Sequence, residues 1–300
     1  MSASQNFSGA LPRSVGTHDG TFHADEVTAC ALLTLFKLVD EGKIVRTRDS
    51  SKLGLCEYVC DVGGIYDPNK KLFDHHQAEY KGTYSSAGMI LEYLLREKVI
   101  NKKEYSFFNE SLVKGVDDFD NGRAPGLTGY SFFSQIIANF APISYEASAE
   151  EGQIAFDAAF QFTYGHLRRL WDRYKYNQDC RDTVQNCMNC SKECLVFDKA
   201  IPWQDSFFEL DGEKHSAKFV IMPSGTHWKL RGIPPDSEHR MSVRFPLPLE
   251  WAGLCDNDLK RVSGIQGAIF CHKGRFISVW ESKEDAFKAL EKVLKAQKMS

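Results

Sequence analysis

Short apolar runs and longer amphipathic segments alternate along the first half of the chain. Residues 24–41 and 86–98 place their apolar side chains at helical spacing, whereas five short apolar runs are typical of buried strands. These runs are residues 14–18, 44–47, 58–61, 71–73 and 112–116. Strands that alternate with helices predict an α/β fold, in which helices flank a mostly parallel five-stranded sheet.

Composition and periodicity divide the second half of the chain into three segments. Residues 130–175 are rich in aromatic residues, Ala and Glu, and their broken helical periodicity predicts a helical segment that closes the first domain. Residues 176–193 are polar with little apolar periodicity, so we place the domain boundary there. Short strands at 195–197, 217–222, 228–233, 267–271 and 276–280 and a closing helix at 283–297 follow. We therefore expect a larger domain over residues 14–180 and a smaller α+β domain over residues 195–300.

Composition narrows the class of protein. The chain has 300 residues with 43% hydrophobic content, which supports two cores and excludes a disordered chain or a disulfide miniprotein. Its formal net charge of −3 lacks the positive field that holds long duplex nucleic acid, so a nucleic-acid substrate should be short. No apolar run reaches the roughly 18 residues of a membrane span. Nine cysteines without an apolar signal segment indicate reduced thiols and a cytoplasmic protein, or a nuclear or mitochondrial one in a eukaryote.

Polar clusters rich in His and Asp follow four of the predicted strands. The first holds two His and three acidic residues within positions 18–26, and Asp61 ends a later strand. Asp74-His75-His76 and the acidic segment 117–122 follow two further strands. Because the carboxyl ends of parallel strands meet at one edge of a sheet, we expect these clusters to lie together. A helix cap or a surface His–Asp pair is the ordinary explanation of one such cluster, but four at strand ends argue against it.

The donor types indicate a metal centre. Mixed imidazole and carboxylate ligands suit Mn²⁺, Fe²⁺, Co²⁺ or Zn²⁺, and several carboxylates favour octahedral Mn²⁺ or Mg²⁺ over a closed zinc site. Two ions fit so many candidate ligands better than one, and an ion pair activates water and clamps a phosphoryl group. The residues therefore predict a metal-dependent phosphoesterase that hydrolyses a phosphate ester or anhydride.

These motifs resemble a known family. Asp74-His75-His76, with Asp61 before it, is similar to the DHH phosphoesterase superfamily of manganese pyrophosphatases, single-strand exonucleases and nanoRNases. More closely, the chain resembles the melanocyte-proliferating-gene family, and the resemblance extends from Val15 to the last helix. It implies an N-terminal DHH-like catalytic domain and a C-terminal substrate-binding domain. The motifs that carry it are residues 16–26, 61–64, 73–76, 85–88, 116–122, 246–248, 251–254 and 262–272.

The resemblance also implies a set of metal ligands. Two divalent ions are expected, with Mn²⁺ first and Mg²⁺ or Co²⁺ as alternatives, and Asp61 is the natural bridge between them. His23 stands where the superfamily has another Asp, and Asp120 is the reserve if Asp117 only caps a helix. The implied ligands are His18, His23, Asp25, Asp61, His75 and Asp117.

Catalytic and substrate-binding roles follow from the same resemblance. His76 would donate a proton to the substrate or stabilise its charge, and Asp25 and His75 complete the catalytic set. A helix that opens with Ser85-Ser86-Ala87-Gly88 offers backbone N–H groups to a phosphate, although an ordinary serine cap explains these residues equally well. The expected substrate-binding residues are Ser85, Ser86, Gly88, Arg244, Gly264, Gly267 and His272, with Arg275 as a further phosphate clamp.

Within this class the resemblance implies a 3′-to-5′ exonuclease that acts on short single-stranded RNA or on nucleotides. A manganese-dependent pyrophosphatase or a small-nucleotide phosphodiesterase with the same metals is the nearest alternative. An alternative of another class is a non-catalytic binding protein whose domains are held together by the metals.

Four cysteines near the domain boundary stand apart from these motifs. Their single Cys-x-x-Cys spacing suits structural zinc or an iron–sulfur centre, and free thiols in a family-specific insert are the alternative. The four are Cys180, Cys187, Cys190 and Cys194.

Overall fold

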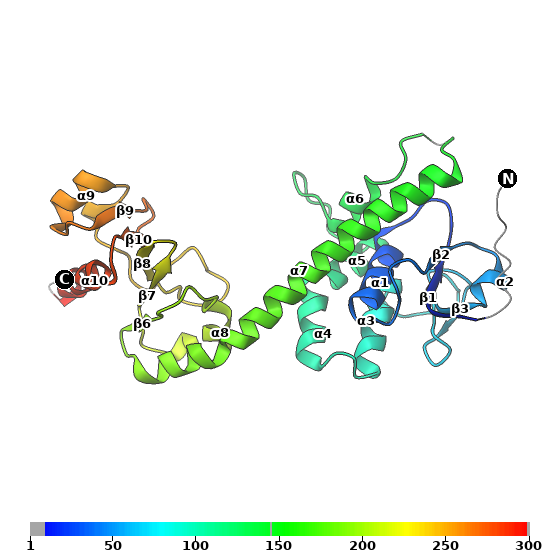
Figure 1. Ribbon diagram of the computed structural model, residues 1–300, viewed down its shortest axis with the longest axis horizontal. Helices are drawn as coiled ribbons and strands as arrows, with labels where there is room; N and C mark the ends of the chain where they lie inside the picture. The colour runs from blue at the N-terminus through cyan, green and yellow to red at the C-terminus, as the bar shows by residue number, and fades with distance from the viewer. Residues whose placement is uncertain (1–9, 145, 299–300) are drawn as a thin grey trace. The chain divides into compact units, whose positions relative to one another are not determined.

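The chain forms two compact units in a computed structural model that describes residues 10–144 and 146–298. The first unit is Met1–Trp171 and the second is Asp172–Ser300. The division lies inside one long helix, α7 (Ala149–Cys190), which therefore contributes to both units (Figure 1).

A five-stranded sheet forms the centre of the first unit. Its strand order is β2-β1-β3-β5-β4, and every neighbouring pair is parallel except the last, β5 with β4. The predicted mostly parallel five-stranded sheet is thus confirmed. The strands are β1 (Leu11–Thr17), β2 (Ile44–Arg46), β3 (Cys56–Cys60), β4 (Tyr66–Asp67) and β5 (Leu72–Phe73).

Helices pack against this sheet around α1, whose residues are buried from Ala24 to Thr34. Helix α1 contacts β3 as well as α3, α5 and α6, so it lies inside the unit rather than on its surface. The core includes Val15 of the sheet, Leu32 of α1 and Met89 of α3. The helices are α1 (Ala24–Leu35), α2 (Ser50–Leu53), α3 (Ser86–Arg96), α4 (Lys102–Phe108), the π-helical Asn109–Val113, α5 (Lys114–Asp120), α6 (Phe133–Ala138) and the first part of α7.

The strand predicted at residues 112–116 is wrong. The segment is helical, because it spans the end of the π-helical turn and the start of α5. Leu112, Val113 and Val116 are all buried, and their spacing is one that places side chains on a single helical face. The short hairpin strand β4 takes the fifth place in the sheet, and the acidic segment after Val116 comes from a helix instead of a strand end.

The second unit is an α+β fold. Its sheet has the order β6-β7-β8-β10-β9, with β6 parallel to β7 and the other pairs antiparallel. Helix α10 packs on one face of the sheet and α8 on the other, on either side of β7 in Figure 1. The elements are β6 (Cys194–Val196), α8 (Gln204–Glu209), β7 (Phe219–Ser224), β8 (His227–Gly232), α9 (Asp256–Ser263), β9 (Ala268–Cys271), β10 (Ile277–Trp280) and α10 (Lys283–Lys298), with 3-10 turns at Gly212–Lys214 and Leu249–Trp251.

The polar segment 176–193, where the sequence places the domain boundary, is almost wholly helical. Helix α7 continues to Cys190, and Val184, Cys187 and Met188 pack together against the core under α8. Three apolar positions at helical spacing are enough to hold a helix whose other faces are solvated, and the surrounding charges hide this narrow stripe in the sequence.

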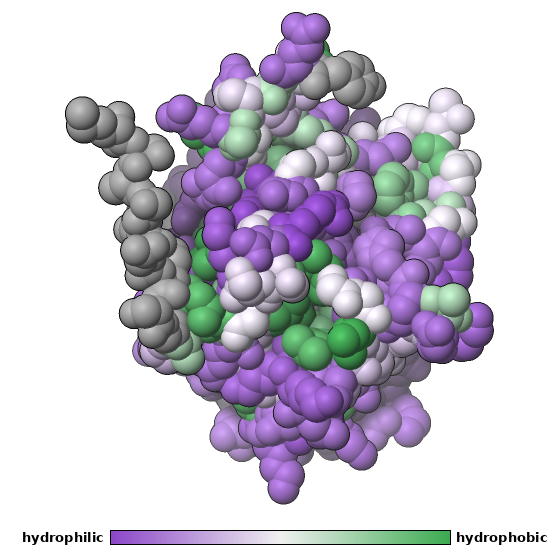
Figure 2. Space-filling model, turned by 90° about the vertical axis from the view of Figure 1, so that its right-hand side faces the viewer, coloured by the Kyte–Doolittle hydropathy of each residue, from purple (hydrophilic) through white to green (hydrophobic). Residues whose placement is uncertain are grey.

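The surface of the protein is predominantly polar on the face seen in Figure 2, where hydrophobic side chains show in a central area and in a smaller one at the upper right. Among the described residues, no helix combines the length and the apolar character that a bilayer crossing requires.

Candidate metal centre

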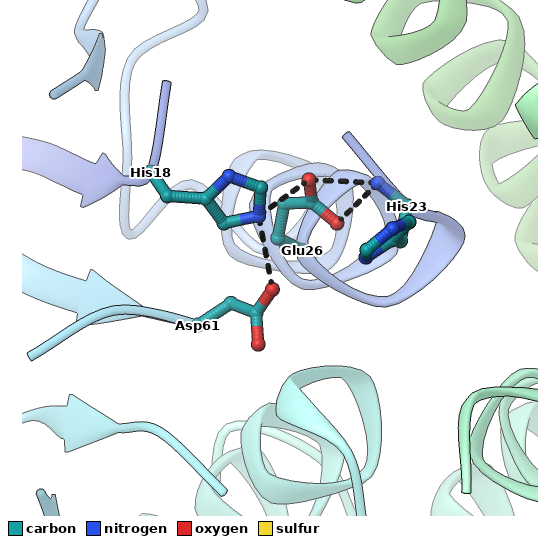
Figure 3. A group of neighbouring side chains, drawn as sticks. All are labelled: His18, His23, Glu26 and Asp61. Carbon is teal, nitrogen blue, oxygen red and sulfur yellow. Dashed lines mark hydrogen bonds and ion pairs between the residues drawn. The ribbon is translucent and has the colours of Figure 1, made fainter. Parts of the chain in front are cut away.

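His18 lies directly after β1 and is held by two carboxylates. Its Nε2 atom is 3.2 Å from Glu26 Oε1 and 3.2 Å from Asp61 Oδ2 (Figure 3). Its Nδ1 atom is 3.0 Å from the carbonyl oxygen of Asp19. Glu26 also caps helix α1, because both of its carboxylate oxygens accept the backbone N–H of His23 at 2.9 Å. The turn from β1 into α1 thus presents an imidazole and a buried carboxylate to the carboxyl edge of the sheet.

Asp61 is the residue where the clusters meet. Its Oδ1 atom lies 3.3 Å from His75 Nε2 and 3.5 Å from His76 Nδ1, and Ser86 Oγ donates to the same oxygen at 3.3 Å. With Oδ2 on His18, both oxygens of this buried carboxylate face nitrogen or hydroxyl groups. Its backbone has a φ of +59°, in the left-handed region, which costs a non-glycine residue free energy. A strained backbone under a buried carboxylate with several partners is typical of a functional site.

The three residues of the DHH motif, Asp74, His75 and His76, have different surroundings. His75 is largely buried, and its Nε2 atom also lies 3.3 Å from Asp120 Oδ2 of α5. His76 is the exposed member, with its Nδ1 atom 2.8 Å from Asp74 Oδ1. Asp74 is buried and accepts the backbone N–H of Gly64 at 2.6 Å on its other oxygen. Asp74 therefore fixes the His76 ring and leaves Nε2 as the nitrogen that is free to meet a substrate.

The carboxylate of Asp25 indicates whether a cation fits the cluster. It is fully buried, Ser86 N donates to its Oδ2 atom at 3.3 Å, and its Oδ1 atom has no hydrogen-bond partner within the described part of the chain. Burial, reinforced by Asp61 and Glu26, raises the pKa of Asp25 well above its usual range. A buried carboxylate oxygen without a donor is costly, and a divalent cation would supply what this oxygen lacks. The donor set fits a metal.

Three overlapping groups of possible ligands surround these carboxylates, each with its ligand atoms within 4.8 Å of one another. Asp61 belongs to two groups and so does His23, so the groups form one continuous cluster rather than separate sites. Mixed imidazole and carboxylate donors suit Mn²⁺, Fe²⁺, Co²⁺ or Zn²⁺. The groups are His18, His23, Glu26 and Asp61; then Asp61, His75 and His76; then His23, Asp25 and Asp120.

Charge in the cluster is balanced between imidazoles and carboxylates. Burial opposes the positive charge of His18, but its hydrogen bonds to Asp61 and Glu26 outweigh burial and raise the pKa of His18 to about 10. Burial likewise opposes the negative charge of Asp61, but His18 and His75 hold the pKa of that carboxyl well below its usual range. The pKa of His75 is raised, because Asp61 and Asp120 outweigh its burial. The metal-free cluster therefore retains a proton on His18 at neutral pH.

We expect the affinity for Mn²⁺ to rise with pH. A metal displaces the proton that His18 holds, and this proton is present throughout the range from about pH 6 to pH 8, because the pKa of His18 lies near 10. Each proton released should raise the apparent affinity about tenfold per pH unit in this range. Calorimetric titration in two buffers of different ionisation enthalpy measures the protons released. Release of at least one proton is expected. An affinity for Mn²⁺ that does not depend on pH would show that His18 holds no proton in the metal-free protein.

The start of α3 holds carboxylates in place. Asp117 Oδ1 accepts Ser85 N at 2.9 Å, Ser85 Oγ at 2.6 Å and Gly88 N at 3.1 Å. Ser86 donates to Asp25 and Asp61 as described above, and Ser85, Ser86 and Gly88 are all buried. The N–H groups expected to meet a phosphate thus meet protein carboxylates. Asp117 belongs to none of the three ligand groups among the described residues, whereas Asp120, one helical turn later, does.

Gly88 provides a test of this packing. A Cβ atom there would collide with the carboxylate of Asp117, so Gly88→Ala must displace a buried group that accepts three hydrogen bonds. We expect this variant to lower the free energy of unfolding by about 2 kcal/mol. Gly115→Ala on α5 is the matched control, because no described residue lies near its added methyl group and Ala favours the helix by about 0.5–1 kcal/mol. Denaturant unfolding measures both, and equal destabilisation of the two variants would contradict the close approach.

The residues expected to bind substrate in the second unit make local structural contacts. The Arg244 guanidinium donates to the carbonyl oxygens of Gly212, His215, Ala217 and Pro234 at 2.6–3.0 Å. Gly264 ends α9 with a φ of +66°, and a Cβ atom at Gly267 would meet Asp285. The His272 ring is tilted against that of Phe276 with the centroids 4.4 Å apart, and Arg275 Nη1 donates to the carbonyl oxygen of Leu247 at 3.5 Å.

The four cysteines near the unit boundary form no ligand group of three or more among the described residues. Cys187 Sγ donates to the carbonyl oxygen of Val196 at 3.4 Å, and Cys190 is exposed. Within the described chain, nothing in their arrangement favours a zinc or iron–sulfur centre over free thiols.

The sequence does not mark Glu26 or Arg48 as functional residues, although Glu26 lies within the motif at residues 16–26. Glu26 occupies the ordinary place of an acidic residue in the first turn of a helix, yet it is completely buried against His18. Arg48, in the loop after β2, lies with its Nε atom 3.4 Å from Asp19 Oδ1. It is the cation on the wall of a cavity of about 740 Å³, which is lined by His18, Asp19, Gly20, Thr21, His23, Arg48, Asp61, Val62, Gly63, Gly64, Asp74, His76 and Gln77.

Comparison with known proteins gives consistent matches over nearly the whole chain. The model of an uncharacterised protein family, UPF0160, matches residues 14–294. The MYG1 protein of Chlamydia trachomatis is 51% identical over 289 residues, which cover 96% of this chain and 99% of the relative. The MYG1 exonuclease of Homo sapiens is 31% identical, over 92% of this chain and 84% of its own length. RecJ of Thermus thermophilus in complex with Mn²⁺ matches 95% of this chain and 52% of its own with a TM-score of 0.29 and 12% identity, a similarity too low to support any conclusion.

Proposed function

The chain belongs to the uncharacterised protein family UPF0160, and we propose that it is a metal-dependent exonuclease that removes nucleotides from the 3′ end of short single-stranded RNA. A relative that shares 31% identity with it over most of both chains is named an exonuclease. The observation that carries the proposal is the continuous cluster of His and carboxylate ligands beside a large cavity. Inside the cluster, the Oδ1 atom of buried Asp25 has no hydrogen-bond partner among the described residues.

The ligands of two divalent ions, Mn²⁺ in the first place, would come from this cluster. Asp120 takes the place of Asp117 in the proposed set of metal ligands. Asp117 Oδ1 already accepts backbone hydrogen bonds from the start of α3, whereas Asp120 lies beside His75. We add Glu26, which shares His18 with Asp61. When bound, such ions lower the pKa of water and neutralise charge on a phosphate. The proposed ligands are His18, His23, Asp25, Glu26, Asp61, His75 and Asp120.

The side chains that remain free are suited to the substrate. His76 Nε2 is available as a general acid, since Asp74 holds Nδ1 and fixes the ring, and it would donate a proton to the oxygen that leaves the phosphorus. Arg48 would bind a non-bridging phosphate oxygen at the wall of the cavity, where its guanidinium is largely exposed. Asp74 and Ser86 are positioning residues, because each acts through a residue that it holds.

The test is hydrolysis of a 5′-labelled single-stranded RNA of about 12 nucleotides with Mn²⁺ or Mg²⁺, beside DNA of the same sequence and inorganic pyrophosphate. We expect a ladder of labelled products that shortens from the 3′ end and disappears with chelator. Immediate release of the labelled mononucleotide would contradict the proposed polarity. Phosphate release from pyrophosphate alone would point to a pyrophosphatase, and no metal-dependent turnover of any substrate would contradict the enzyme.

A further inference from the structure

The sheet of the second unit has one face that helices cover only in part. On the covered side of this face, Val220 and Met222 of β7 are buried under α8 and the end of α7. Farther along the same face, Lys229 of β8 lies opposite Val279 of β10, and Arg231 lies opposite Ile277. All four of these side chains are partly exposed. Residues directly opposite each other in an antiparallel pair share a face, so this part of the face is open to solvent.

The open face combines apolar and cationic side chains. Phe270 of the edge strand β9 pairs with Val279 and is 37% exposed. Lys229 and Arg231 are two residues apart on one strand and therefore point the same way. We call the set of Lys229, Arg231, Phe270, Ile277 and Val279 the open sheet face.

The two cations of the open sheet face lack a compensating charge. Within residues 10–144 and 146–298, no carboxylate forms an ion pair with either of them, and Arg231 reaches only Gln204 Oε1, at 3.4 Å. Burial and the neighbouring Arg231 lower the pKa of Lys229, and burial and Arg240 lower the pKa of Arg231. Two half-buried like charges side by side destabilise one another unless an anion joins them.

We propose that the open sheet face binds single-stranded nucleic acid, with phosphates on Lys229 and Arg231 and a base against Phe270. A basic track beside an exposed aromatic ring is the combination that binds single strands without reading their sequence. The Cα atoms of residues two apart on a strand are about 6.8 Å apart, so their long side chains can reach two phosphates of a flexible single strand. An acidic peptide would use the cations but has no use for the aromatic ring. The proposal builds on the proposed nuclease function and adds a second contact with its substrate.

Binding without turnover tests the proposal. The full chain is titrated in chelator against a fluorescent 12-nucleotide single-stranded RNA at several salt concentrations, and wild type is compared with Lys229→Gln/Arg231→Gln. The double variant should bind at least tenfold more weakly. The slope of log affinity against log salt should fall by about 1.4, because each phosphate contact with a single strand contributes about 0.7. Phe270→Leu should weaken binding about tenfold with an unchanged slope.

Lys288→Gln is the matched control, because Lys288 lies on α10, which packs on the opposite face of the sheet. It should bind as wild type does. The double variant should melt at or above the wild-type temperature without ligand, since it removes two half-buried like charges; a lower melting temperature would indicate a structural role instead. Unchanged affinity and salt slope in the double variant would overturn the proposal, as would displacement of the RNA by polyglutamate at equal charge concentration. Since no step requires hydrolysis, a protein that binds in this way without cleaving RNA would contradict only the proposed function.

Discussion

Asp61→Asn is expected to lose bound Mn²⁺ and to slow hydrolysis about a thousandfold or more, because no other carboxylate of the described chain stands where two ligand groups overlap. Asparagine has nearly the same shape and tolerates the left-handed backbone at this position, so the change removes the charge and one acceptor without adding strain. His18 and His75 would both lose their shared anionic partner. The measurements are the metal content after dialysis, by mass spectrometry, and the rate on the labelled RNA.

Asp236→Asn is the matched control for this variant. Asp236 also pairs with a histidine, His239, at 2.9 Å, but both are in the second unit and outside the cluster. It should retain metal and activity. Melting temperatures of the two variants show whether the fold persists. Full metal content in a folded Asp61→Asn protein would contradict the central place that we give to this carboxylate.

His76→Ala is expected to lower the rate by about 10²–10⁴-fold while the metal stays bound, since general acid catalysis contributes about that much. The side chain is 62% exposed and outside the proposed set of ligands, with its Nδ1 atom 3.5 Å from Asp61 Oδ1, so its loss should leave the ligands in place. Asp74→Asn should give a smaller loss, because the ring remains but its anionic partner is gone. Both variants are measured at saturating metal, with metal content as the second readout.

His239→Ala controls for the loss of an exposed imidazole elsewhere and should retain wild-type activity. If His76→Ala loses metal together with activity, His76 is a ligand rather than the proton donor. If it retains activity within about threefold of wild type, proton donation by His76 is contradicted and the leaving oxygen must be protonated by another group.

The sequence predicts the first unit well where its pattern is regular. The runs at 14–18, 44–47 and 58–61 become β1, β2 and β3, and the polar residues after them meet at one edge, because parallel strands leave no other place for them. The same reasoning is wrong for residues 112–116, which are helical. Their Val and Leu residues suit a strand by propensity, and only their contact with the helical core shows that they form part of a helix.

The site is predictable in residue type but less so in role. His18, Asp61 and the His75-His76 pair stand in recognisable motifs, and the structure brings them together. Glu26 resembles an ordinary acidic residue in the first turn of a helix, and only its burial against His18 shows that it also belongs to a group of possible metal ligands. The choice between Asp117 and Asp120 depends on which way each carboxylate points from α5, and this depends on helix packing that no local motif encodes.

The most direct measurement is an anomalous difference map from a crystal of this protein soaked in Mn²⁺. The central claim is that the cluster at the carboxyl edge of the first sheet holds the divalent ions, with Asp61 as a shared ligand. We expect anomalous density beside the carboxylate of Asp61, within coordination distance of His18 or His75, with Asp117 still bound to α3. Density elsewhere, or none at Asp61 at saturating Mn²⁺, would contradict the metal centre and with it the proposed exonuclease.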